Sequence, residues 1–311
     1  MKTEGYGFKQ WTLLMILALI WGSSFILMKR GLLAYPPDQV AAIRMCVAAL
    51  CLLPWIAHRF REVPINRWKF VAASGFLGNA IPAFLFAFAQ THVNSSVAGM
   101  LNSLTPVFTL LLSFFILKKT SKKVHVIGVL LGLIGALIII VFRSKGGISG
   151  DLNYGLLIAL ATLCYAGSIL IIKTKLGGIP SLPLAGFAVS IGAFPYSFYL
   201  LFTDFGKRFT ADIANAVNPI ELPWLHIPSL GSSSFAAIAL LAIMGTAIAL
   251  LLFNSLIRSS SALFASSVTY LIPLVALFWG FSDHEQLGVY HLIGLLSILG
   301  GVYLINRPET S

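Results

Sequence analysis

Amide, hydroxyl and aromatic side chains recur at helical spacing inside long apolar segments of this sequence. Asn79, Phe86 and Gln90 are seven and four residues apart, so a helix would place them on one face. Groups of this kind hold a small molecule by hydrogen bonds and ring contacts. The candidate solute-contacting residues are Trp21, Ser24, Asn79, Phe86, Asn102, Tyr165, Ser168, Thr246, Thr269 and Tyr270.

Each of these residues also has a purely structural interpretation. Inside a membrane, amides and hydroxyls such as Asn79, Asn102 and Thr269 join neighbouring helices by hydrogen bonds. Trp21 and Tyr165 can belong to the aromatic belt at the membrane surface, although their deep positions favour a cavity. The sequence leaves both interpretations open, and similar positions in both halves of the chain favour a shared site.

Motifs for bond-breaking chemistry and for metal binding are missing from the sequence. The six histidines show no metal-ligand spacing, and there is no P-loop and no GxSxG segment. We therefore expect no metal and no cofactor. ATP-driven transport and serine hydrolysis within this chain are not predicted.

Charge is too scarce for a water-soluble protein of this length. Only 10% of the 311 residues are charged and 58% are apolar, and the mean hydropathy is +0.91. Soluble chains carry about a quarter charged residues. The net charge of +11 does not indicate nucleic-acid binding, because Lys and Arg occur in short clusters between apolar segments. The composition predicts a polytopic membrane protein.

Ten apolar segments are long enough to cross a hydrocarbon layer of about 30 Å as helices. They lack the alternation of a β-barrel, so an all-α membrane protein is expected. The segment 203–234 contains charges and three prolines, and we expect an extramembrane or interfacial loop with one short amphipathic helix. The predicted spans are 11–30, 38–57, 68–90, 95–117, 124–142, 152–173, 181–202, 235–257, 262–282 and 289–306.

The distribution of basic residues predicts the orientation. With a cytoplasmic N-terminus, 14 Lys and Arg lie on the cytoplasmic side and 6 on the other side. Both termini are therefore predicted to be cytoplasmic. Arg44 is the one basic residue well inside a span, and the simplest expectation is that it reaches outward to the membrane surface. Anion contact or gating is the alternative for Arg44, while Glu285 is expected to cap the last span or to close an outer gate.

An internal repeat relates the two halves of the sequence. Gly78 and Pro106 match Gly245 and Pro273 at an offset of 167 residues. At an offset of 144, Ser24 and Lys29 match Ser168 and Lys173, and both serines suit either cavity lining or close packing. Each copy holds five spans, an odd number, so the copies 1–145 and 146–311 are expected to be inverted relative to each other. Inverted repeats are typical of secondary transporters.

Several segments of the chain together resemble a known family. They are Trp21-Gly22-Ser23-Ser24-Phe25 with Lys29, Arg44, Ser95-Ser96, Pro106-Val107-Phe108, Gly128, Gly135, Pro273, Glu285 and Gly294. In this order they resemble the EamA family of the drug/metabolite transporter superfamily, over essentially the full length and as two tandem copies. The resemblance implies a bacterial inner-membrane carrier whose cavity lies between spans 1, 3, 4, 6, 8 and 9. It also implies that spans 5 and 10 pair at the periphery. One departure is Lys118, where the family usually has an acidic residue.

The sequence therefore predicts an alternating-access secondary transporter that moves a small neutral or zwitterionic, amino-acid-like metabolite outward. A lipophilic drug exporter is the alternative, and a passive channel or an intramembrane enzyme remains a further one. The expected partners are the solute and the lipid bilayer, with no nucleic acid. We expect a monomer or a weak homodimer.

Overall fold

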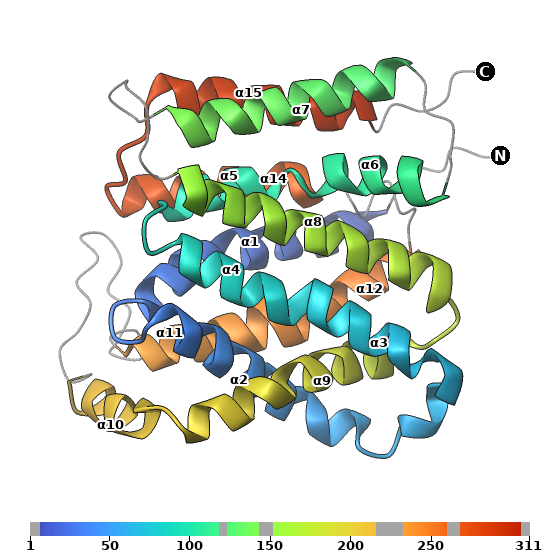
Figure 1. The fold of residues 1–311 in the computed structure, drawn as a ribbon, viewed down its shortest axis with the longest axis vertical. Coiled ribbons are helices and arrows are strands. Elements are labelled where there is room, and N and C mark those ends of the chain that lie inside the picture. Colours follow the sequence, from blue (N-terminus) through green and yellow to red (C-terminus); the bar gives the residue numbers. More distant parts are fainter. Residues whose placement is uncertain (1–6, 118–122, 143–151, 216–232, 260–267, 306–311) are drawn as a thin grey trace.

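The computed structural model describes residues 7–117, 123–142, 152–215, 233–259 and 268–305, and every element in these ranges is a helix (Figure 1). The helices run roughly side by side along one direction, as expected for spans of similar length. The first two are α1 (Phe8–Gly31) and α2 (Pro37–Ile56). They are followed by α3 (Trp68–Gly75), α4 (Ile81–Ala89), α5 (Ser95–Asn102), α6 (Thr105–Leu117), α7 (Lys123–Val141), α8 (Leu152–Lys175), α9 (Ser181–Leu201), α10 (Phe205–Asn215), α11 (Ser234–Ala242), α12 (Ala249–Ser259), α14 (Val268–Ser282) and α15 (Val289–Ile305).

Within these ranges, eight helical segments are long and apolar enough to cross a membrane. They coincide with the first eight predicted spans, and their ends differ by only a few residues. The last two predicted spans, 262–282 and 289–306, contain α14 and α15, which are apolar but shorter. Residues 260–267 at the start of the ninth predicted span lie outside the described residues. The protein is an all-helical, multi-pass membrane protein.

Two spans contain a π-helical segment instead of a uniform α-helix. The segment η3 (Phe76–Ala80) joins α3 to α4, and η4 (Ile243–Ile248) joins α11 to α12. Pro82 contributes to the first, because its nitrogen cannot donate a hydrogen bond to the preceding turn. The two segments occupy matching positions of the sequence repeat, at the offset of 167 residues.

The long polar segment 203–234 begins with the amphipathic helix α10. Phe205 of this helix lies against Tyr35 with ring centroids 6.3 Å apart, and Phe209 lies against Phe235 at 4.7 Å. These contacts fasten α10 over the ends of α1 and α11. The short amphipathic helix expected in this segment is present, and residues 216–232 lie outside the described residues.

Helices α7 and α15 form an intimate pair along one edge of the bundle, at the top of Figure 1. Glycines permit the close approach. A Cβ atom added to Gly301 would lie 2.4 Å from the carbonyl oxygen of Gly128, and one added to Gly135 would lie 2.6 Å from that of Gly294. The contacts are reciprocal between the two helices. In lipid, close backbone packing of this kind drives helix association.

The remaining helices interleave the two halves of the chain. Helix α1 contacts α11, α12 and α14, while α8 contacts α3, α4, α5 and α6. Helix α2 packs along α9. Each helix of the first half therefore has major neighbours in the second half, and the halves do not form two separate globular units.

The α7–α15 contact predicts that alanine substitution lowers the thermal midpoint at one of two adjacent glycines and leaves it nearly unchanged at the other. Gly301→Ala should lower the thermal midpoint of the detergent-solubilised protein, with a cost of about 1–3 kcal/mol, because the new methyl group meets a backbone oxygen. Gly300→Ala is the matched control, since its nearest contact would be the flexible Leu131 side chain at 3.4 Å. Equal midpoints for the two variants, measured by size-exclusion chromatography after heating, would contradict this packing.

Candidate functional site

Arg44 points into the bundle. Its Nε atom donates a hydrogen bond to Thr246 Oγ1 at 3.2 Å, across the contact between α2 and η4. The side chain lies deep among protein atoms, close enough to interact electrostatically with Tyr165 and Tyr196, and it keeps some accessible surface. The expectation that Arg44 reaches outward was wrong, because its face of α2 packs towards η4 and α9.

The π-helical segments supply backbone acceptors near this arginine. Trp21 donates through Nε1 to the carbonyl oxygen of Gly245 in η4 at 3.0 Å, and the Tyr196 hydroxyl donates to that of Ala80 in η3 at 2.9 Å. A π-turn leaves carbonyl groups without their usual helical partner, and such turns are frequent at functional sites. Asn79 lies within η3. Tyr196 was not among the candidate residues suggested by the sequence. The only feature of the sequence that could have indicated it is its position inside the predicted span 181–202.

Aromatic rings line the helices around these polar groups. Trp21 meets Phe253 edge to face at 5.1 Å between ring centroids. Phe86 is stacked on Tyr165 at 6.1 Å, which joins α4 to α8. Three of the predicted residues, Trp21, Phe86 and Tyr165, therefore take part in aromatic contacts between helices that are distant in sequence.

The two serines of the repeat contact glycines of the opposite half. A Cβ atom on Gly245 would lie 2.7 Å from Ser24 Oγ, and one on Gly78 would lie 2.5 Å from Ser168 Oγ. Ser168 is buried and donates to the carbonyl oxygen of Ser74 at 3.1 Å. These contacts are those of closely packed helices, and contact of either serine with a solute stays a prediction.

The remaining predicted residues lie where span 4 changes from α5 to α6. Asn102 ends α5, and its carbonyl oxygen accepts a hydrogen bond from Thr105 Oγ1 at 2.9 Å. Ser103 Oγ donates to the carbonyl oxygen of Thr269 at 3.2 Å, which joins this break to the start of α14. Thr269 and Tyr270 are both partly buried. The structure thus brings Asn102 and Thr269 to the same helix junction.

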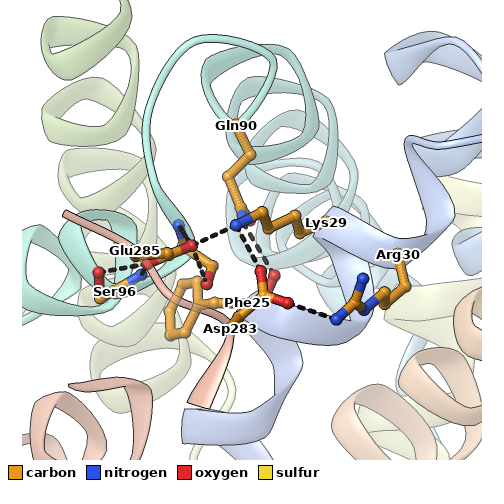
Figure 2. A network of polar contacts seen from close by, with 8 residues as sticks. Phe25, Lys29, Arg30, Gln90, Ser96, Asp283 and Glu285 are labelled. Carbon is orange, nitrogen blue, oxygen red and sulfur yellow. Dashed lines mark hydrogen bonds and ion pairs between the residues drawn. The ribbon is translucent and has the colours of Figure 1, made fainter. Parts of the chain in front are cut away.

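A buried carboxylate joins helix ends at the end of the bundle where α1 ends and α5 begins (Figure 2). We call this end the α1–α5 end; it lies on the left in Figure 1. The Glu285 side chain is 1% exposed, and its Oε1 accepts a hydrogen bond from Lys29 Nζ at 2.7 Å. The carboxylate also accepts from both the backbone N–H and the hydroxyl of Ser95 and of Ser96, the first two residues of α5.

The turn after α14 brings Glu285 to this position. His284 adopts a left-handed conformation with φ of 55°, and the backbone N–H of Glu285 donates to the carbonyl oxygen of Gly280 at 2.8 Å. These features define a Schellman helix end. Gly280 also leaves room, because a Cβ there would lie 2.7 Å from Glu285 Oε2. Glu285 therefore caps α5, and the expectation that it caps the last span was wrong.

Further polar contacts join α1 to the same network. Asp283 pairs with Lys29 at 2.6 Å and also with Arg30. The Gln90 side chain donates from Nε2 to the carbonyl oxygen of Phe25 at 2.9 Å. Helix α1, the end of α4, the start of α5 and the turn after α14 are thereby held together, as Figure 2 shows.

A second acidic residue, missed by the sequence reasoning, caps a second helix at the same end. Asp212 of α10 accepts hydrogen bonds from the backbone N–H groups of Ser234 and Phe235 and from the Ser233 hydroxyl, at 2.7–3.1 Å. The Tyr35 hydroxyl donates to it at 3.2 Å. Paired serines begin both capped helices, Ser95-Ser96 in α5 and Ser233-Ser234 at α11, and this pairing is the signal available in the sequence.

The electrostatic environment keeps Glu285 ionised. Burial alone would raise the pKa of its carboxyl, but the hydrogen bonds from Lys29 and Ser96 and the Lys29 charge outweigh burial and lower the pKa from 4.5 to about 2. A carboxylate with a lowered pKa stabilises the folded state above its ordinary pKa and loses that effect as the pH falls towards 2.

Removing the Glu285 charge should weaken the α1–α5 end. Glu285→Gln should lower the thermal midpoint, with a cost of about 2 kcal/mol, because charge-assisted hydrogen bonds to Lys29 and to α5 are lost. Glu62→Gln is the control, since Glu62 is 38% exposed and pairs with Arg59 at 3.8 Å. The same decrease in both variants, measured by heating in detergent, would contradict the capping role.

The lowered pKa of Glu285 also predicts how the contacts at the α1–α5 end depend on pH. A cysteine introduced at Asn79 should react with maleimide at a rate set by thiol ionisation alone between about pH 5 and 8, because Glu285 stays charged there. The experiment uses a His284→Asn background, because His284 adjoins Glu285 in the turn after α14. A further increase in reactivity centred near pH 6, absent from the Glu285→Gln variant, would show that Glu285 titrates in this range.

Comparison with known proteins agrees with this architecture. The family model of the EamA-like transporter family matches residues 9–141 and 153–307, one match in each half. A solved crystal structure superposes with a TM-score of 0.60 at 18% identity, over 94% of each chain. That likeness concerns the fold alone.

Curated relatives carry transporter names. The chain is 29% identical to the uncharacterized inner membrane transporter YedA of Escherichia coli K12, over 86% of this chain and 80% of the relative. It is 26% identical to the uncharacterized transporter YvbV of Bacillus subtilis, over 96% and 91%. A WAT1-related chloroplastic protein of Arabidopsis thaliana is 23% identical, over 97% and 70%. The resemblance noted in the sequence is confirmed, and the chain belongs to the EamA-like transporter family.

Proposed function

We propose that this membrane transporter is an alternating-access secondary carrier that moves a small neutral or zwitterionic, amino-acid-like metabolite out of the cell. The observation that carries the proposal is the combination of two features: helix ends joined by ion pairs and hydrogen bonds at the α1–α5 end, and a polar and aromatic interior around Arg44 and Thr246. A carrier needs interior groups that bind the solute, and a closure that can pass from one end to the other. This protein has groups suited to both tasks.

An arrangement of two inverted five-helix repeats would let the closure change ends. Four observations support it. The contacts of α1 with α14 and α11 correspond to those of α8 with α6 and α3 when the halves are exchanged. The Ser24–Gly245 and Ser168–Gly78 contacts correspond in the same way, as do η3 and η4. The family model also matches each half once.

The two ends of the bundle differ in charge. Under the repeat, Lys29 corresponds to Lys173 and Glu285 to Lys118. Lys173 is exposed and makes no ion pair within the described ranges, and Lys118 lies outside them. Two lysines cannot reproduce the attraction between Lys29 and Glu285. We therefore propose that the α1–α5 end faces outward and is closed in this state, and that the opposite end closes without a matching ion pair.

The location follows from the family and from the charges. We propose the bacterial inner membrane, as in the name of the YedA relative, with both termini in the cytoplasm and a monomer or weak homodimer as the assembly. The α1–α5 end is then on the side for which the sequence predicts 6 Lys and Arg rather than 14, which agrees with the positive-inside rule.

A lipophilic drug exporter is the second candidate, and it is favoured by the aromatic contacts of Trp21, Phe86 and Tyr165. The two candidates differ in the solute and share the mechanism. A passive channel would instead give flux without counterflow.

Counterflow of labelled amino acids in proteoliposomes tests the carrier. Asn79→Ala and Asn102→Ala should reduce exchange about three- to tenfold, the effect of one lost hydrogen bond, while the protein still folds. Asn66→Ala is the matched control, because Asn66 is exposed in the short helix before α3.

Three outcomes would contradict parts of the proposal. Absence of exchange for every solute in a broad panel contradicts the carrier mechanism. Exchange of lipophilic dyes in place of amino acids selects the drug exporter. Loss of folding in the two variants, with normal exchange by the folded fraction, assigns Asn79 and Asn102 to helix packing.

A further inference from the structure

Arg44 carries a charge that no carboxylate in the described part of the chain balances. Its Nε atom bonds to the Thr246 hydroxyl, and no hydrogen bond or ion pair with a described residue engages its two terminal nitrogens. Its position, seven residues after Pro37, places its Cα roughly 10 Å along α2 from that end of the helix. A guanidinium at such a depth costs several kcal/mol unless a partner or water compensates for it.

The acidic residues that the structure describes are engaged elsewhere. Glu285 and Asp283 bind Lys29, and Asp212 caps α11. The other acidic residues in the described ranges also have partners: Asp38 with Tyr199, Asp204 with Gln39 and Arg208, and Glu62 with Arg59. The four acidic residues outside those ranges, Glu4, Asp151, Glu221 and Glu309, all fall outside the apolar segments of the sequence.

We propose that Arg44 is the subsite for the carboxylate of the transported solute. The two terminal nitrogens of a guanidinium form a planar pair of donors that matches the two oxygens of a carboxylate. Tyr165 and Tyr196 lie near the same charge, and Thr246 holds the guanidinium in place through Nε. The anion supplied by the solute takes the place of the counter-ion that the described residues do not provide.

Because Arg44 supplies a single positive charge, its site should prefer a ligand group with one negative charge. A phosphate carries about 1.5 to 2 negative charges at neutral pH, so a single arginine would leave part of that charge unbalanced at low dielectric. A carboxylate is neutralised by one guanidinium. This inference rests on the proposed carrier function and narrows its solute to molecules with one carboxylate.

Equilibrium binding with matched probes tests the subsite. The full-length protein in lipid nanodiscs is titrated with the twenty L-amino acids and hexanoate, with the amide of each probe that binds, and with inorganic phosphate. We expect a carboxylate probe to bind at least about tenfold more tightly than its amide. In Arg44→Gln this preference should disappear, while Arg44→Lys should keep part of it. Arg59→Gln, at an exposed arginine, should retain the full preference.

A second measurement needs no variant. Phenylglyoxal modification of the wild-type protein, mapped by peptide mass spectrometry, should reach Arg44 without ligand and should be slowed by the carboxylate probe but not by its amide. Failure of Arg44 to react in the ligand-free protein, or equal protection by both probes, overturns the subsite. So do binding of no carboxylate by the wild-type protein and stronger binding of phosphate.

The outcomes separate this inference from the carrier function. Arg44-dependent binding of a carboxylate without counterflow would contradict the carrier and keep the subsite. Counterflow that proceeds in Arg44→Gln with an unchanged KM would keep the carrier and overturn the subsite.

Discussion

The constraint on which this structure depends is the lack of water around its helices. A polar group inside a hydrocarbon layer has to find its partner within the protein. Serine and threonine hydroxyls bond to carbonyl groups of the preceding turn, as Ser24 and Thr109 do. Carboxylates from neighbouring segments satisfy the free N–H groups at the starts of α5 and α11. Among the described charges of the interior, Arg44 departs from this rule.

The same constraint explains why glycines and not large apolar residues mark the closest helix contacts. Lipid tails are as apolar as leucine, so burying leucine against another helix gains little in a membrane. Gly135 and Gly301 instead bring the α7 and α15 backbones together, and Gly78 and Gly245 admit serines from the opposite half. Close packing therefore gives the halves a shared interface in place of two separate cores.

The buried acids differ from the buried arginine in what they are able to do. Glu285 and Asp212 are surrounded by donors, so they hold helices together. The lowered pKa of Glu285 also keeps that carboxylate charged across ordinary pH. Arg44 has a single hydroxyl acceptor and neighbouring tyrosines. The acids therefore have a structural role, whereas we propose that Arg44 binds the solute.

The sequence by itself determined the membrane class, eight spans with nearly correct ends, and the matching positions of the two halves. Those features follow from hydropathy, helix length and residue spacing, which are local properties. Only the tertiary structure decided that Glu285 caps α5, that Arg44 turns inward to Thr246, and that Ser24 and Ser168 contact glycines. Each of these facts is a contact between residues more than 85 positions apart. Hydropathy carries no information about such pairs, because it does not record which faces of the helices meet.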